Sequence, residues 1–242
     1  MTITVLELRN YLLKPDALEH FIDYFEAHFI ASQQAVGMSV LGQFRAIAYP
    51  DHFVWLRGFT DMAARLNGLT DFYGGAFWAK HRHTTNNMIL DNDDVLLLRP
   101  LSDIADLTCG VTAESLAADM AAGTIATQTG LIVVDRYRAH AGQRQALIES
   151  VQTDLLPLYA REGIQVRGLF VAETRENTYP RLPVIQNPDE LVVITAHNGE
   201  AAYRENQAKI QSAIKAIRTH LSQTPEPLLL SPTLRSPIRY LA

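Results

Sequence analysis

The sequence predicts an α+β fold made of two fused copies of one β-α-β-β-α-β unit, whose sheets close into a single pseudo-symmetric barrel. Three observations lead to this prediction. The chain repeats itself, and each copy alternates between strand and helix patterns in the same order. Hydrophobic residues also make up 48% of the 242 positions, which is enough for a sizeable core.

The repeat appears when Tyr11 is aligned with Tyr137, an offset of 126 positions. Without a gap, the same offset pairs apolar residues and glycines in order: Phe21 with Leu147, Phe25 with Val151, Phe29 with Leu155, Gly37 with Gly163, Gly42 with Gly168, and Phe44 with Phe170. Further matches follow after an insertion at 174–188. Because ordered matches at equal spacing are hard to obtain by chance, we interpret the chain as a duplication.

Each copy is expected to follow the order of a ferredoxin-like unit. β-branched and aromatic runs predict strands at about residues 2–12, 39–49, 53–59 and 95–99 of the first copy, and at about 131–138, 165–173, 191–197 and 228–231 of the second. The two sheets then cover each other and close their edges. We expect a first unit over 1–105, a linker with a short helix over 106–129, and a second, diverged unit over 130–242.

Two helices are predicted in each copy. The first carries an apolar stripe at helical spacing, formed by Leu18, Phe21, Phe25 and Phe29. Asp16 and Glu19 are spaced as an N-terminal capping pair for it. The second helix is expected to start near Thr60 or Asp61, and the Gly74-Gly75 pair to interrupt it.

The bulk composition narrows the classes of partner. The formal net charge is -5 and no long charged run is present, so neither nucleic acid nor an anionic membrane is expected as a partner. The chain holds one cysteine, Cys109, and begins directly with a strand pattern. We therefore expect a cytoplasmic protein without a secretory signal or a membrane span.

Several runs of the first copy occur in the order of a known family: Leu8–Pro15, Gly42–Arg45, Val54–Phe59, Asp71–Tyr73, Trp78–Met88 and Asp94–Pro100. These motifs resemble the NIPSNAP family over about residues 3–100, whereas the second copy keeps the pattern and loses most of the signature residues. The resemblance implies a dimeric α+β barrel. Relatives on that fold include cofactor-free monooxygenases, isomerases and haem enzymes, so the chemistry follows only by analogy.

Strand alternation separates two faces of the first sheet. One face is apolar, with Leu6, Leu8 and Leu12 as examples, and we expect it beneath the helices. The other face then collects polar and aromatic side chains: Glu7, Arg9, Tyr11, Gln43, Arg45, Trp55, Arg57 and Arg99.

Four arginines on one face require counter-charges, because a buried unpaired ion is costly. One interpretation is a pocket for an anionic or carboxylate ligand, with Arg57 as a planar clamp. The other is an internal salt-bridge network without a ligand. In the second copy the arginine positions are lost and Arg9 is replaced by Asp135. Either Asp135 pairs with a first-copy arginine, or only one working pocket remains, in the first copy.

The run around Trp78 offers a second set of polar groups, with His81, His83 and Asn86. Two histidines two positions apart lie on different sides of a helix, so a shared metal ion is not expected. His81 can serve as an acid or base, since histidine titrates near neutral pH. A partly buried helix histidine is the simpler interpretation. No phosphate loop or nucleophile elbow is present.

These observations combine into one functional hypothesis and one alternative. The hypothesis is a small-molecule enzyme performing cofactor-free oxidation or isomerisation of a carbonyl, carboxylate or aromatic compound. Its expected catalytic residues are Tyr11, Arg57 and His81, and its expected ligand-binding residues are Arg9, Gln43, Arg45, Trp55, Trp78 and Asn86. No cofactor is predicted, while a haem or a metal ion is left open as an alternative, as is a homodimer. The alternative is a non-enzymatic interaction or stress-associated protein with a structural arginine network.

Overall fold

The computed structural model describes residues 2–101, 107–122 and 130–241. Within them, eight strands form a closed barrel in the order β1-β3-β2-β8-β5-β7-β6-β4. The strands are β1 (Val5–Leu13), β2 (Ser39–Ala46), β3 (His52–Phe59), β4 (Ile89–Pro100), β5 (Leu131–Arg138), β6 (Gln165–Ala172), β7 (Glu190–His197) and β8 (Leu228–Pro232).

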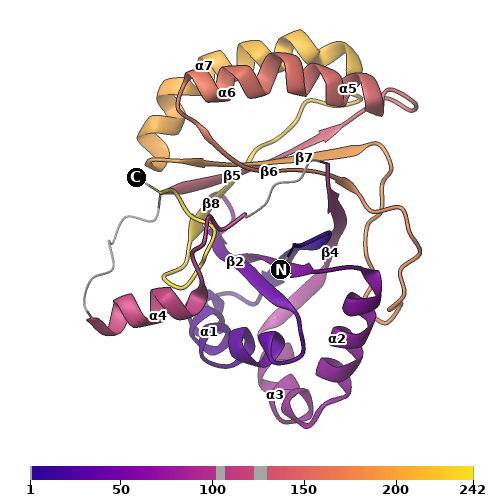
Figure 1. Cartoon of the computed structure of the whole chain (residues 1–242). Helices are drawn as coiled ribbons and strands as arrows, with labels where there is room; N and C mark the ends of the chain where they lie inside the picture. Colours follow the sequence, from indigo (N-terminus) through magenta and orange to yellow (C-terminus); the bar gives the residue numbers. More distant parts are fainter. Residues whose placement is uncertain (1, 102–106, 123–129, 242) are drawn as a thin grey trace.

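Helices cover the barrel on two opposite sides (Figure 1). The helices of the first half are α1 (Leu18–Gln34), α2 (Met62–Gly74) and α3 (Ala76–Asn86), and α4 (Ala113–Ala122) lies in the connection. The second half has α5 (Arg144–Ser150), a π-helical turn (Val151–Leu155), α6 (Leu156–Arg161), α7 (Gly199–Ile217) and a 3-10 turn (Arg218–His220). The chain therefore has the predicted fold of two β-α-β-β-α-β units.

The seams between the halves are short antiparallel ladders. At one seam β2 pairs with β8, with Arg45 opposite Ser231, and at the other β4 pairs with β6, with Arg99 opposite Val171. These ladders remove the free sheet edges, which would otherwise expose unpaired backbone groups. The predicted closure of two sheets into one barrel is confirmed.

The barrel interior is an apolar core shared by both halves. It contains Leu6, Leu8, Val54 and Leu56 from the first half, packed with Ile132, Val134, Phe170, Val192 and Ile194 from the second. We expected the apolar face of the first sheet to lie beneath the helices, and this is wrong. The apolar face lines the barrel, and the polar face lies beneath α1 and α2, because two facing sheets bury aliphatic side chains without needing a counter-charge.

Two predicted helix starts had different outcomes. Asp61 caps α2 through its carboxylate, which accepts a hydrogen bond from the backbone N–H of Ala64 at 2.7 Å. The predicted capping pair of Asp16 and Glu19 is wrong. The N-cap of α1 is Ala17 without a side-chain hydrogen bond, and Asp16 has a positive φ of 64°. Asp16 thus forms the turn before the helix, a conformation that Asp tolerates better than most residues.

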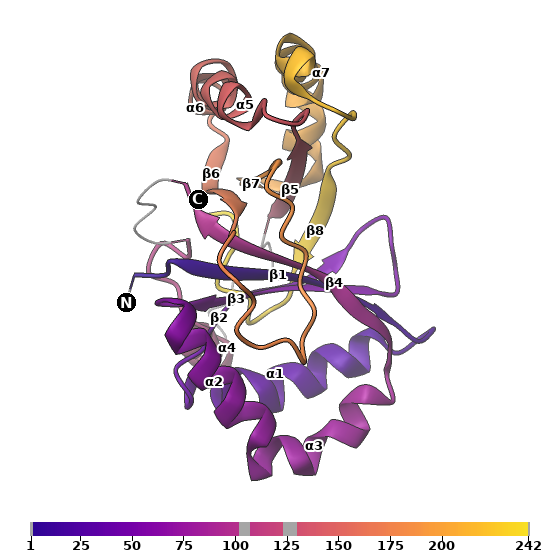
Figure 2. The same cartoon turned by 90° about the vertical axis from the view of Figure 1, so that its right-hand side faces the viewer.

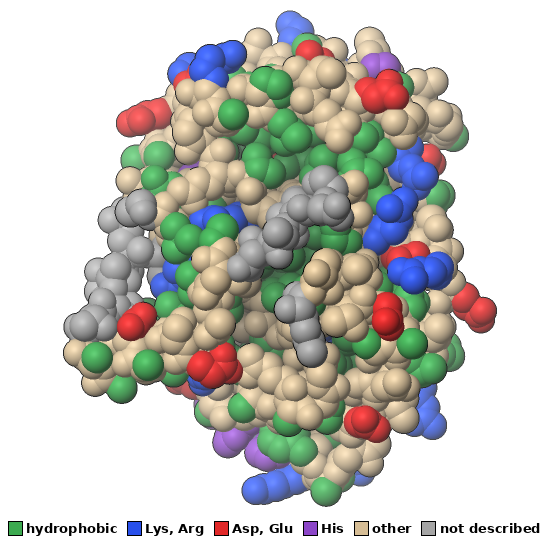
Figure 3. Space-filling model, viewed as in Figure 1, with side chains coloured by type: hydrophobic (Ala, Val, Ile, Leu, Met, Phe, Trp, Pro, Cys, Tyr) green, Lys and Arg blue, Asp and Glu red, His purple; other side chains and the backbone are tan. Residues whose placement is uncertain are grey.

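Two surface properties bear on possible partners. Among the described residues, no helix combines the length and the apolar character needed to cross a membrane. On the face shown in Figure 3, basic side chains lie beside acidic ones and do not form a continuous basic surface.

Candidate functional site

A cavity of about 380 Å³ lies between the first-half sheet and its helices. Its wall is mainly aromatic, with Tyr11, Phe21, Phe25, Phe29, Trp55, Phe72, Tyr73, Trp78 and Tyr179. The sequence contains two tryptophans, so both lie in this wall. A largely apolar cavity with a few polar groups is the usual form of a small-molecule site.

The stripe of α1 builds one side of the cavity. Phe21, Phe25 and Phe29 follow each other at intervals of one helical turn, and the Phe25 ring lies 5.0 Å from the Trp55 ring of β3. The other side depends on the sharp break between α2 and α3. A Cβ atom at Gly75 would lie 2.7 Å from the backbone oxygen of Asp71, so this position requires glycine. After the break, α3 brings Trp78 to the wall.

Beneath the wall, one buried carboxylate binds three buried arginines. Glu7 is fully buried and contacts Arg57 at 2.6 Å, Arg9 at 2.7 Å and Arg65 at 2.8 Å. We call these four residues the Glu7 cluster. Burial alone would raise the pKa of Glu7, but the three guanidinium groups outweigh burial and hold the pKa well below its usual range. With one negative and three positive side chains, the cluster carries an excess of two positive charges.

The Glu7 cluster reaches the cavity through two polar residues. The Nε of Arg9 donates a hydrogen bond of 3.0 Å to the Tyr11 hydroxyl, and Nη1 of Arg57 donates one of 3.1 Å to Oε1 of Gln33. Gln33 in turn donates to the backbone oxygen of Phe29. Tyr11 and Gln33 both line the cavity. The buried charge therefore fixes the two polar groups of the cavity floor.

The same cluster holds a loop of the second half over this cavity. Nη1 of Arg65 donates to Oδ1 of Asn177 at 2.9 Å, and Asn177 also bonds the backbone of Tyr179 and Leu182. Tyr179 stacks on Tyr73 with the ring centres 6.1 Å apart. Figure 2 shows the loop descending from β6 and β7 across β4 towards the first-half helices. The insertion at 174–188 thus completes the first-half cavity.

The predicted ligand-binding and catalytic residues separate into three groups. Tyr11, Trp55, Trp78 and Asn86 line the cavity. Arg9, Arg57 and Gln43 are buried and do not form its wall. Arg57 is bound to Glu7 and is therefore not a free clamp. Arg45 is placed elsewhere, in a surface ion pair of 2.5 Å with Glu19.

His81 also lies outside the cavity wall. Its Nδ1 is 2.7 Å from the Tyr24 hydroxyl, and its ring is 4.7 Å from that of His28, so it packs between α3 and α1. Burial, together with His28, lowers the pKa of His81. Among the described residues, no three His, Cys, Asp or Glu side chains are grouped so that they could hold a metal ion.

Several cavity residues were missed from the sequence: Gln33, Arg82, Thr85, Asn92, Arg181 and Leu182. Gln33 follows Phe29 by four positions, so continuing the α1 stripe by one turn would have found it. Arg82 and Thr85 lie in the run from Trp78 to Met88 that carries part of the resemblance. No sequence pattern pointed to Arg181 and Leu182 as cavity residues, because they come from the other half of the chain.

The second half contains a different buried group. Asp135, at the position equivalent to Arg9, is 4% exposed and forms no ion pair within the described chain. Its side chain lies on the helix side of its own sheet near Tyr137, Tyr159 and Tyr203, whose pKa values it helps to raise. The suggestion that Asp135 pairs with a first-half arginine is therefore wrong. Burial raises the pKa of Asp135 to about 7.

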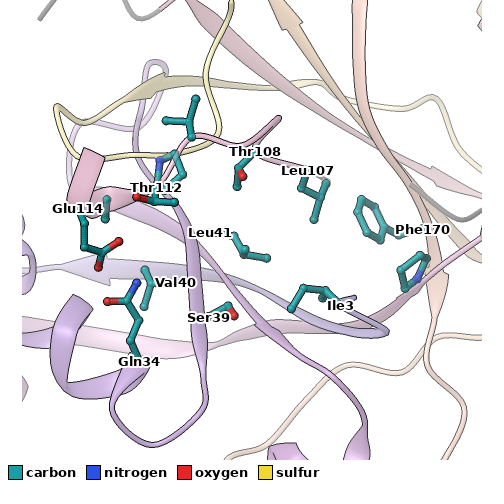
Figure 4. Close-up of a pocket in the computed structure, with 14 residues that line it drawn as sticks. Ile3, Gln34, Ser39, Val40, Leu41, Leu107, Thr108, Thr112, Glu114 and Phe170 are labelled. Carbon is teal, nitrogen blue, oxygen red and sulfur yellow. The ribbon is translucent and has the colours of Figure 1, made fainter. Parts of the chain in front are cut away.

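A second cavity, of about 350 Å³, lies beside the connection between the halves (Figure 4). Its wall combines Ile3 and Leu41 of the first half with Leu107 and Phe170. Glu114 is the charged residue of this wall. The aromatic cavity, with its polar floor and buried charges, is the stronger candidate for a functional site.

Comparisons with known proteins agree with the fold. No family model matches the sequence, and no curated protein matches it. A solved structure from Lactobacillus acidophilus, described as a "putative monooxygenase", has a TM-score of 0.60 and 12% identity, covering 95% of this chain and 94% of that chain. An "anthrone oxidase-like protein" has a TM-score of 0.58 and 8% identity, covering 95% and 91%.

NIPSNAP proteins are also among the structural neighbours. A NIPSNAP-like domain protein from Burkholderia xenovorans is 24% identical, covering 43% of this chain and 90% of that chain with a TM-score of 0.39. The full-length neighbours match across both halves. The chain therefore has the dimeric α+β barrel fold, with both units of the barrel in one polypeptide.

Proposed function

We propose that this chain is a small-molecule enzyme whose substrate binds in the aromatic cavity of the first half. The proposed reaction is oxidation of an aromatic or carbonyl compound by O₂ without a cofactor. The observation that carries the proposal is the floor of the cavity, where Tyr11 is fixed by Arg9 above the positively charged Glu7 cluster. Two full-length neighbours are described as monooxygenase or oxidase-like proteins, which supports this class of reaction as an analogy.

Tyr11 is suited to donate a hydrogen bond to a substrate oxygen. Its own oxygen accepts a hydrogen bond from Arg9, so its proton is available, and no hydrogen bond within the described chain uses that proton. Burial raises the pKa of Tyr11 despite the opposing effect of Arg9, so the phenol stays protonated at neutral pH. A protonated phenol backed by positive charge stabilises an oxyanion that forms on the substrate.

The oxyanion is the species that such chemistry needs. The substrate loses its acidic proton to solvent, and the resulting phenolate or enolate is electron-rich and passes electrons to O₂ directly. A proton returns from solvent when water forms. In the conversion of a methylene group to a carbonyl group, one oxygen atom of O₂ enters the product and the other leaves as water with the two hydrogens. The residues of this chain bind and orient the substrate, exclude water with the aromatic wall, and stabilise its anion.

Ligand binding can be tested by intrinsic fluorescence. Because both tryptophans line the cavity, an aromatic ligand should change the emission of the whole protein. We expect anthrone to do so with saturation, and native mass spectrometry to show a one-to-one complex. A tryptophan signal that does not respond to any of a series of aromatic ketones and phenols would contradict the proposal.

Activity can be tested by O₂ uptake with anthrone as substrate, after chelator treatment and with subtraction of spontaneous oxidation. We expect Tyr11→Phe to lower the rate by at least about tenfold, with anthrone binding retained. His81→Gln serves as the control, because His81 is outside the cavity wall. Equal rates for wild type and Tyr11→Phe would remove Tyr11 from the mechanism.

The Glu7 cluster itself favours a second candidate function. Its arginines are buried and bonded within the protein, as expected of a structural network. A non-enzymatic barrel would keep this network and show no O₂ uptake with any aromatic substrate. The cavity beside the network is what favours the enzyme.

A further inference from the structure

The charged side chains that line the aromatic cavity are all positive. Two of the residues that line it are arginines, Arg82 of α3 and Arg181 of the second-half loop, and no aspartate or glutamate is among them. This imbalance runs against the composition of the chain, which carries a formal charge of -5. The cavity therefore concentrates positive charge on an acidic protein.

The guanidinium groups of Arg82 and Arg181 are not bound to other polar side chains of the described residues. Both are exposed, and neither forms an ion pair or a side-chain hydrogen bond with the described residues. Arg175 of the same loop behaves differently, since it binds Glu173. Asp91 and Asp93 flank the cavity residue Asn92, yet no ion pair joins either of them to these arginines.

The buried charge acts in the same direction. The Glu7 cluster holds an excess of two positive charges directly behind Tyr11 and Gln33. In a cavity walled by aromatic rings these charges are screened less than charges in water. Positive charge therefore lies behind the floor of the cavity and at its mouth. This charge favours the binding of an anion and disfavours the binding of a cation.

We propose that the substrate is an aromatic carboxylic acid. Its ring system lies among the aromatic side chains of the wall, and its carboxylate lies at the cavity mouth against Arg82 and Arg181. A planar guanidinium group matches a carboxylate with two parallel hydrogen bonds. The inference rests on the proposed function and adds the class of substrate. It also makes the second half part of the site, because Arg181 comes from that half.

The test compares 2-naphthoate with its neutral analogue 2-naphthamide by isothermal titration calorimetry at low salt. Both probes have the same ring system and differ in charge. We expect the wild-type protein to bind 2-naphthoate at least about tenfold more tightly, the value of one good charge-assisted contact. Arg82→Gln and Arg181→Gln should each remove most of this preference without changing the affinity for 2-naphthamide. Both side chains are exposed, so the variants are expected to fold.

Lys80→Gln is the matched control, because it removes one positive charge from the same helix outside the cavity wall. It should leave both affinities unchanged. Equal binding of the two probes, or a preference that survives in both arginine variants, would overturn the inference and leave the proposed function standing. If neither probe binds and tryptophan emission also fails to respond to neutral aromatics, the proposed function falls and the inference with it.

Discussion

Replacing Asp135 with asparagine should stabilise this protein at neutral and alkaline pH. Asp135 is 4% exposed, lies in the apolar core of the second half, and has no ion pair in the described chain. The surrounding polar groups on β5, α6 and α7 are the phenols of Tyr137, Tyr159 and Tyr203, and His197 lies on the neighbouring strand β7. Burial also lowers the pKa of His197, to about 4, so this histidine does not balance an ionised Asp135 at pH 7.

The size of the effect follows from the pKa of Asp135. It is about 7 in the folded chain, against an ordinary value of 3.8. At roughly 1.4 kcal/mol per pKa unit, this difference corresponds to about 4 kcal/mol. Because the folded value is the higher one, the folded chain keeps a proton that the unfolded chain releases. The free energy of unfolding therefore falls as the pH rises from about 4 to about 7, and the full cost is present above that range.

The measurement is urea unfolding of wild type and Asp135→Asn at pH 4, 5.5 and 8. We expect similar stabilities at pH 4 and an advantage for the variant that grows to a few kcal/mol at pH 8. Asp154→Asn is the control, since Asp154 is exposed in the same half of the chain. A variant that is less stable than wild type at pH 8 would refute the reasoning, because it would show that the folded protein stabilises the charged carboxylate.

Three further predictions concern the first half and the repeat. Glu7→Gln should lower the free energy of unfolding in urea near pH 7 by about 3–5 kcal/mol, because three buried arginines lose their counter-charge. As the control, Glu19→Gln at the surface should lower it by at most about 1 kcal/mol. Similar losses for the two variants would contradict a stabilising role of Glu7 among the buried arginines. Because the pKa of Glu7 is lowered in the folded chain, its contribution to the free energy of unfolding should be complete above pH 4.5 and should disappear as the pH falls. Asn177→Ala should release the loop from Arg65 and speed proteolysis within 174–188, with exposed Glu176→Ala as the control; unchanged cleavage would show that Asn177 does not anchor the loop. Gly42→Ala and Gly168→Ala should each lower the free energy of unfolding by about 1–3 kcal/mol, because the added methyl group meets the buried ring of Phe44 or Phe170. An unchanged stability at either site would argue against equivalent packing in the two copies.

The sequence predicted the repeat and the order of elements because both depend on local patterns. The stripe of Phe21, Phe25 and Phe29 is a helical period, and the alternation in β1 is a strand period, so each is visible in a few residues. The paired glycines at 42 and 168 are also local, since each sits two positions before a phenylalanine whose ring fills the space that a side chain would need. The polar face of Glu7, Arg9, Tyr11, Trp55 and Arg57 was recognised as one set by the same rule.

Alternation alone could not tell which face meets the helices. Both faces of the first sheet are buried, one in the barrel and one beneath α1 and α2. The usual rule that the apolar face packs against helices therefore failed. The aliphatic face packs against the second sheet. On the other face, Arg9 of β1 and Arg57 of β3 both bind Glu7, and Arg57 also bonds Gln33 of α1.

The sequence by itself determined that this chain is a duplicated α+β unit whose two copies share core positions and differ in the polar face of the sheet. Strand alternation also placed Tyr11 and Trp55 on one face of the first sheet, and the run from Trp78 to Met88 brought Trp78 and Asn86 into one segment. Only the tertiary structure decided that Arg57 is bound within the protein, that His81 lies apart, and that Arg181 and Tyr179 of the second half complete the cavity of the first. These relations join residues that lie from 50 to 112 positions apart, and no local period records a contact over such distances.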